Sequence, residues 1–168
     1  MYKFTTMDLT HVHLLVTHLP IYGSILGGFV LAYGIWAKSS PTVVAAYFIF
    51  IISALGAGIA YATGESAEET LEGLKLLNKG KVDQHEDFAL SALWGFIILG
   101  IAGIIGLFFS LKNWAGTQYV SFIILFMAFI SFGLVAYTGF LGGQIRHTEL
   151  EGTNNSRATD FRQGEETD

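Results

Sequence analysis

The fold of this chain is decided by a long uncharged stretch, FALSALWGFIILGIAGIIGLFFSL at residues 88–111. The hydrocarbon core of a bilayer is about 30 Å thick and needs about 20 apolar residues in a helix. This stretch meets that length without a Lys, Arg, Asp or Glu. It therefore predicts a helix that crosses a membrane.

Three further stretches have the same character, at residues 14–36, 41–63 and 117–143. The chain of 168 residues is only 14% charged, against about 25% in an ordinary soluble domain. The sequence thus predicts an all-α fold, a four-helix transmembrane bundle over residues 1–150. It runs up-down-up-down, with both termini on the same side. A polar tail at residues 151–168 lacks apolar content and is expected to be disordered.

The connections between the four stretches are of two kinds. Residues 38–41 and 112–116 are tight turns. Residues 64–87 form a longer, charged connection in which glutamates recur at helical spacing, so the second helix is expected to run past the membrane surface. Within it, Asp83 and Glu86 match a capping box and predict that the third helix begins there.

Composition excludes several classes of site and partner. The chain has no cysteine, which rules out disulfides, thiolate metal sites and covalently attached c-type haem. Its formal net charge of −5 argues against a nucleic-acid partner. No cleavable signal is expected, because Lys3 is the single cation before the first apolar run. No Glu-x-x-His pair, phosphate loop or nucleophile elbow is present, so the sequence does not decide whether the protein is an enzyme.

Histidines and acidic residues gather at one end of the predicted bundle. Of the nine Lys and Arg residues, only Lys38 and Lys112 fall at the opposite end. Ionisable groups at membrane depth are costly and tend to be paired or functional. The candidate metal ligands are His13, His18, Glu65, Glu68, His85 and His147.

Three interpretations of this cluster remain open. Imidazoles and a carboxylate could hold a Zn, Cu or Fe ion. Alternatively, two of the three candidates His18, His85 and His147 could be the axial ligands of a b-type haem wedged between helices. In the third interpretation these side chains are hydrogen-bonding and capping groups at the membrane surface. Whichever interpretation applies, the spacing places His11 and His18 on one helical face and His13 on another.

Two motifs resemble a known bacterial family. HLLVTHLPI at residues 13–21 is similar to the opening signature of the integral-membrane family catalogued as domain of unknown function 2231, and TGFLGGQIRH at residues 138–147 resembles its closing Gly-Gly motif. Residues 64–69 with His85 and Glu86 are similar to its middle junction. The resemblance implies a four-helix membrane domain that often occurs beside cytochrome-like or Rieske-type redox domains. It implies no established reaction.

These features together predict a multi-pass protein of the cell membrane, in a bacterial inner membrane. Its expected role is accessory to respiratory or other redox chemistry through a metal or haem site, with the lipid bilayer and a separate redox protein or membrane complex as partners. The alternative is a non-catalytic structural or assembly subunit of a membrane complex. A small transporter is disfavoured, because carriers usually place ionisable groups at mid-membrane.

Overall fold

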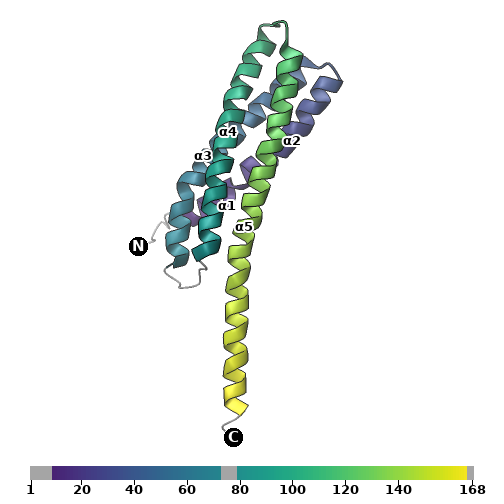
Figure 1. The fold of residues 1–168 in the computed structure, drawn as a ribbon. Coiled ribbons are helices and arrows are strands. Elements are labelled where there is room, and N and C mark those ends of the chain that lie inside the picture. Colours follow the sequence, from purple (N-terminus) through teal and green to yellow (C-terminus); the bar gives the residue numbers. More distant parts are fainter. Residues whose placement is uncertain (1–8, 73–78, 166–168) are drawn as a thin grey trace, which may run out of the picture.

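A computed structural model describes residues 9–72 and 79–165, with side chains placed over residues 11–64 and, apart from Lys81, 80–144. The described part is helical throughout, with short turns between helices (Figure 1). The helices are α1 (Leu9–Val16), α2 (His18–Trp36), α3 (Ser40–Glu72), α4 (Lys79–Leu111) and α5 (Thr117–Glu165).

Four segments are long and apolar enough to cross a membrane: His11–Trp36, Ser40–Gly64, Val82–Leu111 and Thr117–Gln144. Each contains one of the four stretches identified in the sequence, so the prediction of an all-helical bundle with four candidate spans is confirmed. The outward surface of the bundle is strongly apolar. Trp36 is 80% exposed, Tyr119 78% and Phe126 68%. A continuous apolar surface of this kind is typical of contact with lipid.

The helices form a closed ring, in which α2 packs on α3, α3 on α4, α4 on α5, and α5 on α2. Figure 1 shows the α2–α3 and α4–α5 turns together at one end of the bundle. We call this the turn end. The last turns of α3 and the first turns of α4 lie at the other end, with α1 beside them. We call this the histidine end.

The first span is divided into two helices at Thr17, whereas the sequence predicted one continuous helix over residues 14–36. Pro20 gives the physical reason. It has no N–H to offer the carbonyl of Val16, and its ring crowds that carbonyl, so the hydrogen-bond ladder is interrupted here. The segment before the break, α1, packs mainly on α3. His13 and His18 therefore lie on different helices.

Both tight turns end their helix in the same way. Lys38 and Asn113 each adopt the left-handed region, with φ of 51°. The N–H of the residue after Lys38 donates to the carbonyl of Gly34 at 3.0 Å, and the N–H of Trp114 donates to that of Phe109 at 3.1 Å. This is the Schellman arrangement, which satisfies carbonyls that the end of a helix leaves without a partner.

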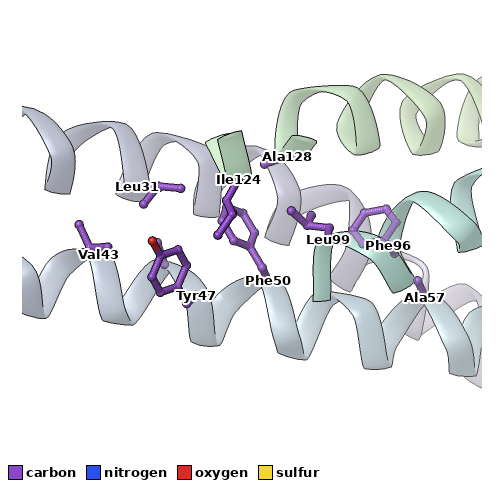
Figure 2. Packing of buried hydrophobic residues seen from close by; sticks show 10 residues of the cluster. Leu31, Val43, Tyr47, Phe50, Ala57, Phe96, Leu99, Ile124 and Ala128 are labelled. Atoms are coloured by element: carbon purple, nitrogen blue, oxygen red, sulfur yellow. The ribbon is translucent and has the colours of Figure 1, made fainter. Parts of the chain in front are cut away.

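The core of the bundle is built on large side chains at the centre of the ring. Tyr47, Phe50 and Phe96 have no exposed surface (0%). Figure 2 shows them packed with Leu31, Val43, Ala57, Leu99, Ile124 and Ala128. The Tyr47 hydroxyl lies 2.8 Å from Ser121 Oγ on α5. Because Ser121 Oγ already donates to the carbonyl of Thr117, the Tyr47 hydroxyl is the donor.

Three helix ends bear on the sequence predictions. Helix α3 continues to Glu72, as the glutamate spacing predicted. Helix α4 begins at Lys79, so Asp83 and Glu86 lie inside it and the predicted capping box is wrong. Helix α5 continues to Glu165, where the sequence predicted a disordered tail over residues 151–168; its last three residues lie outside the described part. No proline follows Thr117, and helical hydrogen bonds are local, so nothing in the backbone stops α5 earlier.

Candidate functional site

His13 reaches across from α1 to the backbone of α3. Its Nδ1 lies 2.8 Å from the carbonyl oxygen of Ala60. A carbonyl only accepts, so Nδ1 carries the proton and donates it, and in the neutral ring the lone pair is then on Nε2. Thr63 Oγ1 lies 3.5 Å from the same nitrogen but forms a shorter bond, of 2.9 Å, to the carbonyl of Ile59.

His85 makes the corresponding contact between α4 and α5. Its Nδ1 lies 3.0 Å from the carbonyl oxygen of Thr138. By the same reasoning Nδ1–H is the donor and the lone pair of Nε2 is left available. The Thr138 hydroxyl donates to the carbonyl of Leu134 at 2.9 Å, which orders the backbone group that His85 uses.

A glycine lies beside each of these imidazoles. A Cβ added at Gly64 would lie 3.5 Å from His13 Cε1, and one added at Gly142 would lie 3.2 Å from His85 Cε1. The first distance is an ordinary contact, whereas the second is tight enough to require the His85 ring to shift. The glycines therefore let each ring lie close against the neighbouring helix.

The two imidazoles are half-buried, and both lie at the histidine end of the bundle. In metalloproteins a histidine ligand usually donates its second ring N–H to a carbonyl or carboxylate, which fixes the tautomer and the ring orientation. His13 and His85 both show this arrangement. Chemically, the pair offers two oriented nitrogen donors at the histidine end of the bundle.

His18 and His11 do not share this position. His18 is exposed; its Nδ1 donates to the carbonyl of Leu14 at 2.9 Å, and its ring stacks on Tyr22 with centroids 6.0 Å apart. His11 is exposed as well. The sequence placed His18 with His85 as a cofactor ligand, whereas the structure sets His13 across from α3 and leaves His18 on the outer surface. The break at Thr17 accounts for the difference, because it changes which face of the first span turns inward.

The side chains of Glu65, Glu68 and His147 lie outside the described residues, although their backbones continue α3 and α5 at the histidine end. Their predicted roles as metal ligands stay predictions. Among the side chains that are placed, no group of three or more His, Asp or Glu is positioned to hold a metal ion. The pair His13 and His85 is thus the part of the predicted cluster that the described residues bring together.

A hollow of about 380 Å³ lies at the opposite, turn end of the bundle. Its lining includes Lys38, Ser39, Thr117 and Ser121. The hydroxyls of the last three residues have hydrogen-bond partners close by in the chain. The hollow is remote in the fold from the imidazole pair, and its hydroxyls serve the helix starts that surround it.

Sequence reasoning missed the backbone groups that orient the imidazoles. Nothing in the residue types of Ala60 or Thr138 marks their carbonyls as acceptors, because every residue has one. A helical glycine near a histidine did carry a signal. Gly142 belongs to the closing Gly-Gly motif and leaves space beside His85, and Gly64 does the same beside His13.

Comparison with known proteins finds no matching family model, no matching curated protein and no matching solved structure. The resemblance to the domain of unknown function 2231 family therefore stays a prediction.

Proposed function

We propose that this membrane protein binds a metal centre, a metal ion or a b-type haem, through His13 and His85 and takes part in redox chemistry. The observation that carries the proposal is the shared tautomer of the pair. Each Nδ1–H is used by a backbone carbonyl of a neighbouring helix, at 2.8 Å and 3.0 Å. Each Nε2 is left as an oriented donor, which is the form in which imidazole binds a metal.

A metal ion and a b-type haem require different numbers of protein ligands. A Zn, Cu or Fe ion held by imidazoles takes further donors, for which His147, Glu65 and Glu68 are the candidates at this end. The iron of a b-type haem takes four nitrogens from the porphyrin and needs only two axial ligands from the protein. The pair could serve in either centre.

A redox role follows where the centre is haem, iron or copper, because zinc does not exchange electrons. Haem and copper both exchange electrons, and their potentials are tuned by burial and by hydrogen bonds to the ligands. The resemblance to a family found beside cytochrome-like and Rieske-type domains supports this reading, and it also supports a bacterial inner membrane as the location. We propose a separate redox protein or membrane complex as the partner.

A second candidate is a structural or assembly subunit without a cofactor. The observation that favours it is that both imidazole bonds join different helices, α1 to α3 and α4 to α5. Among the described residues, no buried side-chain nitrogen or oxygen lacks a hydrogen-bond partner. In this case the histidines act as ties between helices within the membrane.

Metal and haem content distinguish the two candidates. The full-length protein is purified from membranes and examined by elemental analysis and by absorbance in the Soret region. The proposed function predicts a stoichiometric metal or haem that is lost from His13→Ala and His85→Ala and retained by His18→Ala, whose ring lies on the outer surface.

The structural candidate gives a different pattern. His13→Ala and His85→Ala would then lower the melting temperature relative to His18→Ala, while all three variants and the parent protein lack a bound metal centre. A parent protein without stoichiometric metal or haem, even after incubation with each, would overturn the proposed function.

A further inference from the structure

The chain consists of two helical hairpins that have the same turn conformation and the same spacing of key residues. The first hairpin comprises α1, α2 and α3, and the second comprises α4 and α5. Their turns have the same backbone conformation, with Lys38 and Asn113 both at φ of 51°. The hydrogen bonds that span three residues in these turns also correspond. The N–H of Lys38 donates to the carbonyl of Ile35, and the N–H of Asn113 donates to the carbonyl of Ser110, each at 3.2 Å.

The entering helices of the two hairpins carry the same residues at the same spacing. Gly23 follows His13 at the interval at which Gly95 follows His85. An aromatic residue precedes each glycine, Tyr22 in the first hairpin and Trp94 in the second.

The returning helices match as well. Ser53, Ala60 and Gly64 on α3 have the spacing of Ser131, Thr138 and Gly142 on α5. The contacts between entering and returning helices correspond pair by pair. A Cβ at Gly23 would collide with Ser53, and one at Gly95 would lie 3.5 Å from Ser131 Oγ.

The histidines complete the correspondence. His13 donates to the carbonyl of Ala60 and touches the position of Gly64, and His85 does the same with Thr138 and Gly142. The two imidazoles thus occupy equivalent places in two copies of one structural unit.

The packing between hairpins is consistent with a two-fold rotation. A rotation that carries α2 onto α4 and α3 onto α5 also carries the α3–α4 contact onto the α5–α2 contact, and both contacts are present. Gly100 on α4 faces Ala54 of α3, while Gly28, at the equivalent place on α2, faces Phe129 of α5. Both turns lie at the same end of the bundle (Figure 1), so the axis runs along its length.

We infer that the chain is a tandem pair of equivalent hairpins and that its metal site is correspondingly symmetric, with His13 and His85 each giving one imidazole nitrogen to a single metal centre. The inference rests on the proposed function and names the ligand chemistry: a centre that accepts two equivalent imidazoles. The iron of a b-type haem and a copper(I) ion both have this chemistry.

The test uses the full-length protein in detergent, titrated separately with hemin and with copper(I). Visible absorbance and electron paramagnetic resonance report six-coordinate, low-spin iron in the hemin arm. Competition with a copper(I) chelator gives the affinity in the other arm. The variants are His13→Gln and His85→Gln, whose amides can still donate to the carbonyls of Ala60 and Thr138, with His18→Gln as the control.

The expected result is equality between the two sites. In the hemin arm, each substitution should convert low-spin to high-spin haem to the same extent. In the copper(I) arm, the dissociation constants of the two variants should agree within about threefold (under 1 kcal/mol at 1.4 kcal/mol per tenfold). The double variant should bind neither. Added imidazole should restore the low-spin spectrum of both single variants to the same extent.

Other outcomes overturn the inference and separate it from the proposed function. If one substitution abolishes binding and the other changes it less than threefold, the sites are not equivalent, although a metal centre is present and the proposed function stands. If the bound ion also needs His147, Glu65 or Glu68 as ligands, the symmetric site is again overturned and the proposed function stands. If neither hemin nor any metal ion binds, both proposals fail.

Discussion

At the scale of single residues, the bundle core leaves no room for a side chain at Gly106. A Cβ there would lie 2.6 Å from Ile124 Cδ1 and 2.7 Å from Tyr47 Cζ, and both neighbours are buried in the core. Overpacking of a filled core costs about 1–3 kcal/mol. We expect the free energy of unfolding of Gly106→Ala to be lower by this amount than that of a Gly→Ala variant at an open helical position, as measured by denaturant titration in detergent.

The matched control is Gly133→Ala. Gly133 is exposed on α5, and a Cβ there would meet nothing within 4 Å. Alanine favours a helix over glycine by about 1 kcal/mol, so this variant should equal or exceed the parent protein in stability. Equal stability of the Gly106 and Gly133 variants would contradict the close packing of α4 against α3 and α5.

The buried hydroxyl of Tyr47 makes a second prediction. Tyr47→Phe removes its bond to Ser121 but leaves Ser121 Oγ donating to the carbonyl of Thr117, so no buried donor is orphaned. The loss of stability should therefore be small, about 0.6 kcal/mol and under about 2 kcal/mol. Tyr119→Phe is the control, because Tyr119 is 78% exposed, and it should leave the unfolding midpoint unchanged. A loss at Tyr47 no larger than at Tyr119 would show that the bond between α3 and α5 contributes nothing.

At the scale of helices and turns, the two Schellman ends are held by residues other than glycine. Lys38 and Asn113 both have φ of 51°, a conformation that glycine adopts without strain. Lys38→Gly should raise the free energy of unfolding by about 0.5–1 kcal/mol. Asn113→Gly should raise it less, because asparagine tolerates the left-handed region better than lysine does.

The comparison for these turns is Lys112→Gly. Lys112 lies in the last turn before Asn113 and has no positive φ. Glycine there adds freedom to the unfolded chain without relieving strain, so this variant should be destabilised. A stability order with Lys112→Gly above Lys38→Gly would be inconsistent with the turn geometry.

The element scale also shows what the sequence could predict. The spans were predictable because a bilayer demands length and apolarity, and both are visible in any uncharged stretch. The break at Thr17 was not, since Pro20 is compatible with the first turn of a helix as well as with an interruption. The start of α4 was misplaced because Asp83 and Glu86 match a capping pattern that also occurs inside helices.

The candidate site was predictable only in part, because the break at Thr17 was not predicted. Alternating spans place histidines from distant parts of the chain at one end of the bundle, and that much follows from connectivity. Which histidine faces the interior depends on helical phase. The break before Pro20 resets that phase, so His13 rather than His18 turns towards α3.

At the scale of the whole molecule, the two hairpins are alike at their ends and differ in their core. Gly27 lies against Phe50 in the first hairpin, where a Cβ would be 2.7 Å from the ring. The equivalent places in the second hairpin hold Leu99 and Ala128, so the large and small partners are exchanged (Figure 2). Such an exchange conserves volume, which is the kind of change that packed cores tolerate best. Divergence in the core is therefore compatible with a symmetric site at the histidine end.

The arrangement of the hairpins predicts how the chain crosses the membrane. Because the chain has no cysteine, a single introduced cysteine can be labelled without background. Ser40 and Ala115 are exposed at the turn end, and Gly80 is exposed at the start of α4, at the other end.

A membrane-impermeant maleimide added to sealed vesicles should label Ser40→Cys and Ala115→Cys from the same side and Gly80→Cys only after permeabilisation, or the reverse for all three. The physical reason is that α3 and α4 together form two crossings between the turns, which returns the chain to the side it left. Labelling of Ser40→Cys and Ala115→Cys from opposite sides would mean that one of these helices does not cross, and the closed ring of four spans could not exist in a bilayer.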